Sequence, residues 1–190
     1  MKRIIDAITA YKPYTEQEAA DKKLFLDKLQ FQDNLLTREN QEYHFSSSAW
    51  VVNPTYDKVL IVYHNIYQSY SWTGGHADGC EELLTVAQKE LEEETGIKEY
   101  QLIYDGLFAF DILPVNAHYK KGQFIKAHHH INTTYLFMAS ENQDLQVKAD
   151  ENSAVKWIEV ADLDQAVTEK EMRPYYHKLM EKALIKRNNG

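Results

Sequence analysis

Three glutamates, Glu90, Glu93 and Glu94, are the residues whose type and spacing most directly suggest chemistry in this chain. They stand at positions i, i+3 and i+4 of a segment rich in helix formers, so on a helix they would share one face. Carboxylates held this close raise one another's pKa unless solvent screens them or a cation neutralises them. Magnesium prefers oxygen ligands and commonly lies between carboxylates and phosphate oxygens. For these residues alone, a solvated acidic face remains the other interpretation.

The segment that carries the glutamates, 80–95, has no Gly or Pro and is expected to be a helix. Leu84, Ala87 and Leu91 predict its buried stripe, and Gly96 is typical of a helix terminator. Thr15 and Glu18 fit a capping box at the start of an earlier helix. The pattern predicts helices at 15–30, 162–167 and 173–186, and strands or extended pieces at 46–53, 58–64, 69–75, 100–112, 131–138 and 153–160. A bend is expected near Gly106 in the strand at 100–112. This order favours an α/β (α+β) fold with a mixed β-sheet.

The composition argues against several classes of protein. The chain has 190 residues, 44% of them hydrophobic, which is enough for a packed core. Its net charge of −8 argues against a nucleic-acid partner, which usually requires a basic face. The apolar runs are too short for a membrane span or a signal peptide. With Cys80 as its one cysteine, the chain has no internal disulfide, and we expect a cytoplasmic protein.

The glutamates belong to a longer spaced pattern. Gly75 is followed by five residues and Glu81, then by seven residues and Lys89, and the segment continues Lys89-Glu90-Leu91-Glu92-Glu93-Glu94-Thr95-Gly96-Ile97. This pattern resembles the Nudix box, Gly-x5-Glu-x7-Arg-Glu-U-x-Glu-Glu-x-Gly-U, where U is a bulky aliphatic residue. Eight of the nine defined positions match, and Lys89 stands where the box has arginine. The resemblance implies a Nudix α/β/α sandwich with a mixed sheet.

The resemblance also implies roles for the matching residues. Glu90, Glu93 and Glu94 would hold Mg²⁺, with Mn²⁺ as the alternative ion, and the carbonyl of Gly75 could be a further ligand. Glu93 is our choice for the group that activates the attacking water. Lysine at position 89 carries the charge of the family's arginine but cannot form its bidentate brace. We therefore expect either slightly looser glutamates or a protein that binds its ligand without cleaving it.

Weaker similarity extends outside the box. Residues 72–78 resemble the Trp-x-x-Gly-Gly-His-x-Asp run of a Nudix subgroup with an N-terminal helical extension, and 128–135 resemble its His-x-His-x-Asp-x-x-Tyr segment. His76, His128, His130 and Trp72 are therefore candidate substrate contacts. Alternate side chains of a strand share a face, so His128 and His130 could also converge on a transition metal. A polar loop entering a strand is the remaining interpretation.

The resulting hypothesis is a hydrolase that cleaves the diphosphate linkage of a small molecule, such as a nucleoside diphosphate linked to a group X. The predicted organisation is an N-terminal helical extension (1–43), a Nudix domain (44–170) and a C-terminal helix packed on it (171–190). Many proteins of this class are dimers, so a homodimer is also expected by resemblance. One alternative is a non-catalytic nucleotide-ligand sensor on the same fold, which Lys89 leaves open. Another is an isoprenoid-diphosphate isomerase, for which Cys80 is poorly placed.

Overall fold

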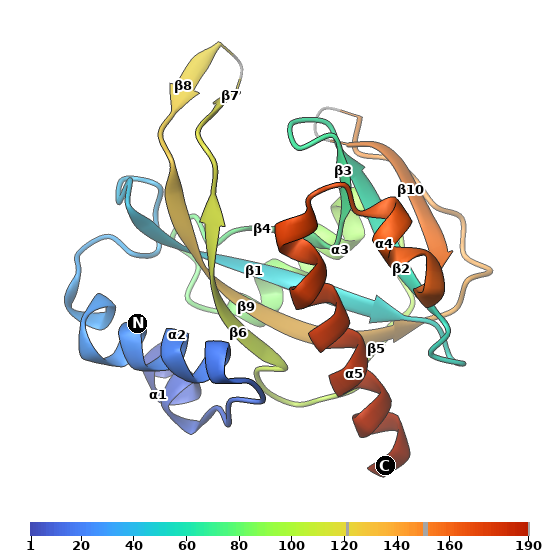
Figure 1. Ribbon diagram of the computed structural model, residues 1–190, viewed down its shortest axis with the longest axis horizontal. Coiled ribbons are helices and arrows are strands. Elements are labelled where there is room, and N and C mark those ends of the chain that lie inside the picture. Colours follow the sequence, from blue (N-terminus) through green and yellow to red (C-terminus); the bar gives the residue numbers. More distant parts are fainter. Residues whose placement is uncertain (121, 150–151, 190) are drawn as a thin grey trace. The chain divides into compact units, whose positions relative to one another are not determined.

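The computed structural model describes residues 1–120, 122–149 and 152–189 (Figure 1). The chain divides into two compact units. Unit 1 contains Met1–Ser48, Gly74–Gln88 and Tyr104–Tyr135, and unit 2 contains Ala49–Thr73, Lys89–Ile103 and Leu136–Gly190. Each unit is therefore built from three separate stretches of the sequence. No helix among the described residues has both the length and the apolar character needed to cross a membrane.

Two α-helices precede the described strands, one α-helix lies between two groups of strands, and two α-helices follow them. The α-helices are α1 (Lys2–Ala10), α2 (Glu16–Asp27), α3 (Leu83–Thr95), α4 (Leu163–Ala166) and α5 (Arg173–Asn189). The strands are β1 (Tyr43–Val52), β2 (Lys58–His64), β3 (Ser69–Ser71), β4 (Thr73–His76), β5 (Tyr100–Leu102), β6 (Ala109–Val115), β7 (His118–Lys120), β8 (Gln123–Ile125), β9 (His128–Ala139) and β10 (Asn152–Glu159). Short 3-10 turns lie at Leu29–Phe31, Val160–Asp162 and Lys170–Met172. Eight of these strands form one sheet with the central order β10-β2-β1-β9-β5, and β7 pairs with β8 separately.

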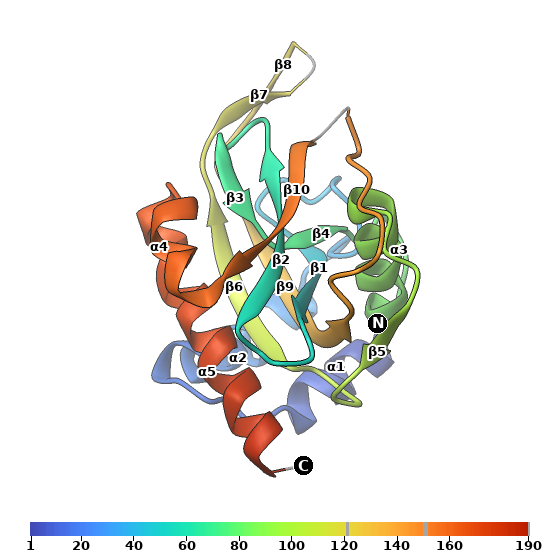
Figure 2. The same cartoon turned by 90° about the vertical axis from the view of Figure 1, so that its right-hand side faces the viewer.

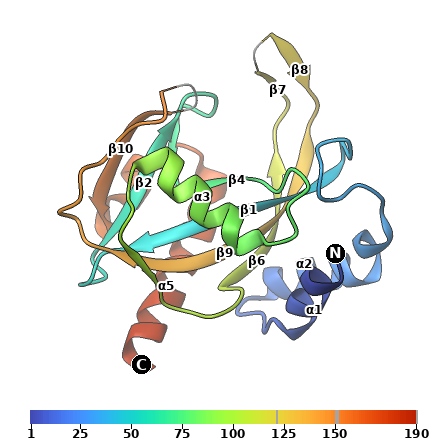
Figure 3. The same cartoon turned by 180° about the vertical axis from the view of Figure 1, so that it is seen from behind.

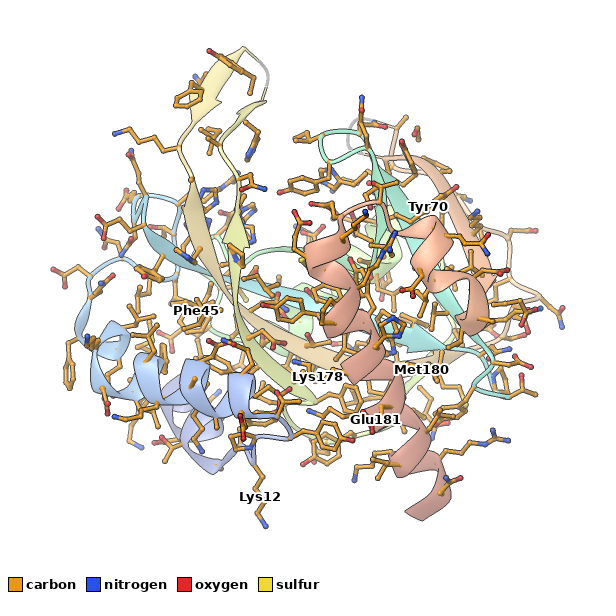
Figure 4. All side chains as sticks on the ribbon, viewed as in Figure 1. Lys12, Phe45, Tyr70, Lys178, Met180 and Glu181 are labelled. Carbon is orange, nitrogen blue, oxygen red and sulfur yellow. The ribbon has the colours of Figure 1, made fainter. Side chains whose placement is uncertain are left out.

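Unit 1 is built on an antiparallel pair, β6 with β9, that runs from Ala109↔Thr134 to Val115↔His128. Helix α2 packs on β6 through Phe25, which is fully buried. The Phe25 ring meets the rings of Phe45 and Phe110 edge-on, with centroids 5.6 and 5.8 Å away. Figure 4 shows Phe45 beside α2. The N-terminal helices are thus part of the hydrophobic core of unit 1.

A buried polar contact fixes α2 in the same place. The Asp21 carboxylate accepts a hydrogen bond from the backbone N–H of Ile112 on β6 at 3.0 Å. Thr15 caps α2 by accepting from the backbone N–H of Glu18 at 3.2 Å, as predicted. The Glu18 carboxylate, however, accepts from the Tyr11 hydroxyl and from the Tyr14 N–H instead of returning to Thr15. Only half of the predicted capping box forms, because Glu18 links α2 to the segment before it.

Unit 2 is organised around β2, which pairs antiparallel with β10 from Asn152↔His64 to Glu159↔Lys58 and with β3 (Figure 2). Its core contains an aromatic cluster. The Trp50 ring stacks on the Tyr176 ring of α5 with centroids 5.7 Å apart, and Trp72 meets both rings edge-on. Burial raises the pKa of the Tyr176 phenol well above its usual range, so this group stays protonated.

The predicted fold class, an α/β (α+β) arrangement with a mixed sheet and an N-terminal helical extension, is confirmed. Some elements differ from the expectation. Helix α1 and the β7–β8 hairpin were not predicted. The expected strand at 100–112, with its predicted bend near Gly106, is two separate strands on either side of Gly106, which has φ +131°. Helix α3 begins at Leu83, not at residue 80, and its buried side contains Leu83 whereas Leu84 is half-buried.

Candidate functional site

The three glutamates of α3 lie in unit 2, on the helix seen in Figure 3. Their exposure differs strongly. Glu94 is 3% exposed, while the side chains of Glu90 and Glu93 are 14% and 41% exposed. Glu94 stands seven residues after Ala87 and three after Leu91, so it continues the buried stripe. The acidic face is thus adjacent to the buried stripe of α3, not opposite to it.

Two residues near the beginning of β10 meet these carboxylates. The Lys148 Nζ lies 3.3 Å from Glu93 Oε2 and 3.7 Å from Glu90 Oε2. The Asn152 Nδ2 donates a hydrogen bond to Glu94 Oε1 at 2.9 Å. An ammonium group therefore lies between two of the carboxylates, and an amide holds the third. Carboxylate oxygens that face one point stabilise a positive charge placed there.

The side-chain oxygen of Asn152 adds a further acceptor. Asn152 is 1% exposed, and its Oδ1 is buried without a hydrogen-bond partner among the described residues. A buried acceptor without a donor is costly, and such groups commonly face a water or an ion. The Asn152 amide meets Glu94 through its Nδ2, and its Oδ1 is a separate buried acceptor beside the carboxylates. Oxygen donors of this type are what Mg²⁺ selects.

The side chain of Lys89 lies near Glu93 and is largely exposed, and a role for Lys89 in catalysis stays a prediction. Its side chain is 65% exposed, and its Nζ lies 3.7 Å from one oxygen of Glu93. An exposed pair at this distance contributes little to stability. Lys148, which is more buried and contacts two glutamates, holds the carboxylates more directly than Lys89 does.

Gly75 lies in β4, in a stretch that belongs to unit 1. Its preceding residue, Gly74, makes a close approach to β1. A Cβ at position 74 would lie 2.7 Å from Ser48 Oγ and 2.8 Å from the Ser47 carbonyl oxygen. The first glycine of the pair is therefore required by packing. The carbonyl of Gly75 as a metal ligand stays a prediction.

The candidate histidines gather in unit 1. His76 at the end of β4 and His130 in β9 lie with His44 of β1, and one ring nitrogen of each falls within 4.8 Å of the others. His128 joins them, its Nε2 being 3.3 Å from His130 Nε2. The predicted convergence of His128 and His130 on one face of a strand is confirmed. His129 points elsewhere and stacks on Tyr43.

Burial keeps part of this cluster neutral. Burial is the main cause that lowers the pKa of His44, although a hydrogen bond to the Asn40 carbonyl opposes it. Burial, followed by repulsion from His76 and other imidazoles of the cluster, holds the pKa of His130 well below its usual value. A neutral imidazole has one donor N–H and one lone-pair nitrogen. His44 and His130 therefore each present an acceptor nitrogen.

Trp72 is 9% exposed and packs against Trp50 and Tyr176 in the core of unit 2. These contacts favour a packing role, and substrate contact by Trp72 stays a prediction.

Asn132 replaces the aspartate of the subgroup pattern, and it is buried. Its side-chain oxygen accepts hydrogen bonds from the Ser46 and Ser48 hydroxyls at 2.9 and 2.8 Å. An amide suits this neutral setting, because its NH₂ also donates to Thr134.

Three residues of these sites escaped sequence reasoning. Lys148 and Asn152 stand more than fifty residues after the glutamates that they contact, and no local motif marks them. His44 precedes the expected strand at 46–53, and nothing in the sequence marks it as a site residue. More than eighty residues separate His44 from His130, so no local sequence pattern links them. Only the pairing of strands brings the two side chains together.

Solved structures with the same fold belong to the Nudix class. A C. elegans Ap4A hydrolase aligns with 76% of this chain and 98% of its own, at 17% identity and a TM-score of 0.54. The NUDIX domain of Shewanella oneidensis NrtR, solved as a complex with ADP ribose, aligns with 85% of this chain and 97% of its own, at 19% identity and a TM-score of 0.53. At these identities the likeness establishes the fold.

The sequence comparison gives the family. The NUDIX domain matches residues 35–179, so the chain belongs to the Nudix family. A curated relative, the RNA pyrophosphohydrolase of Pelagibacter ubique, is 33% identical over 106 residues. That match covers 53% of this chain and 66% of the relative, just under two thirds of its length.

Proposed function

We propose that this chain is a magnesium-dependent Nudix hydrolase that cleaves the diphosphate linkage of a small metabolite, such as a nucleoside diphosphate linked to a group X. The observation that carries the proposal is the convergence of Glu90 and Glu93 on the Lys148 ammonium, beside buried Glu94, within the family's defining segment. Family membership supports the reaction class. The net charge of −8 favours a compact substrate over a polymer, because a long phosphate backbone requires a basic surface.

The donor set fits a divalent cation. Glu90, Glu93 and Glu94 present carboxylate oxygens, and Asn152 adds a buried oxygen without a hydrogen-bond donor among the described residues. Lys148 places a positive charge among them already. Mg²⁺, or Mn²⁺ in its place, would polarise a phosphoryl oxygen and hold the attacking water when bound. We expect the Gly75 carbonyl to be a further ligand.

Four side chains of the proposed site have separate roles in the reaction. Glu93 is the most exposed of the three glutamates, so it is our choice for the group that accepts the proton of the attacking water. Glu90 and Glu94 hold the cation. Glu94 is fixed by Asn152, which limits its movement during the reaction. Lys148 balances charge while no substrate is bound, and its ammonium is a suitable partner for a substrate phosphate.

The experiment is phosphate release from a panel of dinucleoside polyphosphates, nucleoside triphosphates, nucleotide sugars, ADP ribose and a short 5′-triphosphorylated RNA. Each is assayed with Mg²⁺, with Mn²⁺ and with chelator. We expect release from at least one small substrate that chelator abolishes. Absence of release from the whole panel, together with metal-dependent binding of one nucleotide, would instead assign the chain to the class of non-catalytic ligand sensors. Preference for the RNA would contradict the proposed substrate class.

Lys148 and Lys89 offer a test of the carboxylate cluster. Replacing Lys148 by Met removes a positive charge next to Glu90 and Glu93 but keeps the apolar stem, so Mg²⁺ is expected to bind about 3- to 10-fold more tightly. Lys89→Met is the matched control, since Lys89 is exposed and lies 3.7 Å from Glu93. Calorimetric titration with Mg²⁺ measures both. A larger effect at Lys89, or weaker binding in Lys148→Met, would contradict the assigned cluster.

A further inference from the structure

The proposed hydrolysis assigns no chemical step to the histidine cluster of unit 1, although substrate contact by His76, His128 and His130 stays a prediction. Its members come from three strands: His44 from β1, His76 from β4, and His128 and His130 from β9. Their rings are mutually adjacent. Centroids are 5.1 Å apart for His44 and His76, 5.0 Å for His44 and His130, and 4.9 Å for His76 and His130. The His128 ring lies 4.9 Å from His44 and 5.1 Å from His130.

The His44 ring has one nitrogen beside a backbone carbonyl and one without a hydrogen-bond partner among the described residues. His44 is 4% exposed, and its Nε2 is buried without a hydrogen-bond partner among the described residues. Its Nδ1 lies 2.9 Å from the Asn40 carbonyl oxygen. A carbonyl can only accept, so the ring proton is on Nδ1 and the lone pair is on Nε2. A buried lone pair of this kind requires a donor or a cation.

His128 is fixed in the same way. Its Nδ1 lies 2.8 Å from the Lys126 carbonyl oxygen, which leaves the lone pair on Nε2. Metal-binding histidines usually donate their other ring N–H to a carbonyl or carboxylate, and this outer contact sets the tautomer. Two backbone carbonyls thus orient His44 and His128 as ligands. Neither of these two hydrogen bonds involves the glutamates of α3.

The spacing of the nitrogens fits a small tetrahedral ion. In such a site, metal–nitrogen distances of about 2.0–2.1 Å place the ligand atoms about 3.3 Å from one another. The Nε2 atoms of His128 and His130 are 3.3 Å apart. Ligand atoms of His44, His76 and His130 lie within 4.8 Å of one another, which side-chain rotation alone can shorten.

We propose that His44, His76 and His130, with His128 as the fourth donor, form a transition-metal site that binds Zn²⁺. Imidazole nitrogen suits zinc, copper, iron and nickel, whereas Mg²⁺ prefers oxygen. The site is therefore chemically distinct from the carboxylate site and selects a different ion. With four imidazoles from three strands, the ion would cross-link β1, β4 and the start of β9 and stabilise unit 1.

The first test is metal binding by the full chain without a histidine tag. Chelator-treated protein is titrated with Zn²⁺ in excess Mg²⁺, which occupies oxygen ligands but competes poorly for imidazole. We expect saturable binding of one Zn²⁺ per chain and a melting temperature that rises with Zn²⁺ concentration. Substitution with Co²⁺ should give the visible absorption of a tetrahedral nitrogen site. Absence of saturable binding, or of that absorption, would overturn the proposal.

The second test compares histidines inside and outside the cluster. His76→Asn and His130→Asn are expected to weaken Zn²⁺ binding by at least about 100-fold, since loss of an outer contact alone commonly costs 10- to 100-fold. His129→Asn is the matched control, because His129 stacks on Tyr43 outside the cluster. Circular dichroism checks that each variant folds. If a variant does not fold, the Co²⁺ spectrum of the unmodified chain becomes the test of the metal site. Equal Zn²⁺ affinity in the three variants, or binding of inorganic phosphate but not of Zn²⁺, would overturn the site.

Discussion

Replacing Glu93 by Gln is expected to lower metal-dependent turnover by about 10²-fold or more, because glutamine can neither accept the proton of the attacking water nor contribute charge to the cation. Glu90→Gln and Glu94→Gln should also lower turnover, mainly through weaker binding of the divalent ion. In Glu94→Gln the side-chain carbonyl can still accept from Asn152, so the fold should be retained. Steady-state rates measured over a range of Mg²⁺ concentrations separate the two kinds of loss.

Glu92 supplies the control for this series. It lies on the same helix, is exposed, and accepts a hydrogen bond from the Tyr100 hydroxyl at 2.5 Å. Glu92→Gln removes the same charge from α3 without touching the three candidate ligands, so turnover should change little. Turnover that is unchanged in Glu90→Gln, Glu93→Gln and Glu94→Gln would remove the proposed mechanism. An equal loss in Glu92→Gln would show that the effect comes from the net charge of the helix.

Replacing Phe25 by Ala is expected to lower the free energy of unfolding by about 3–5 kcal/mol, the usual cost of deleting a fully buried phenyl group. Phe25 is 0% exposed and meets the rings of Phe45 and Phe110. The loss would show that the N-terminal helices are integral to the core of unit 1. Urea unfolding followed by circular dichroism and by tryptophan fluorescence measures the change.

Phe31→Ala is the matched control for the Phe25→Ala variant. Phe31 lies four residues after the end of α2 and is 76% exposed, so Phe31→Ala should change stability by no more than about 0.5 kcal/mol. A small effect in both variants would mean that the extension packs only loosely. In that case the extension (1–43) would fold separately from the Nudix domain (44–170). We expect instead that the two segments unfold together.

The reaction class could be predicted from the sequence because that information is local. Glu90, Glu93 and Glu94 are four residues apart at most, and a helix of about 3.6 residues per turn brings them together whatever the rest of the chain does. The same holds for the helix end at Gly96, which has φ +76° and occurs where the pattern predicts it. The alternation of side chains along a strand likewise brings His128 and His130 to one face, as predicted.

Other features depend on contacts between distant segments, which no local pattern encodes. The burial of Glu94 follows from the approach of Asn152, and the charge of Glu90 and Glu93 is balanced by Lys148. Sequence reasoning points instead to Lys89, the nearest cation in the chain, although the side chain of Lys89 is exposed.

The predicted bend near Gly106 is a full break between two strands, and this difference has a similar origin. Gly106 has φ +131° and separates β5 from β6, but a glycine can either continue a strand or end it. Which of the two occurs depends on the strands that pair with its neighbours, and that pairing is not a local property of the sequence.

Spacing along the chain was enough to predict the family, the fold class and the helix that carries the three glutamates. The folded arrangement was needed to show which cation contacts those glutamates and which histidines lie together. His44 and His130 are separated by more than eighty residues, and only the pairing of strands places their nitrogens within 4.8 Å. Ligand sets of this kind are determined by sheet register, which the folded core selects as a whole.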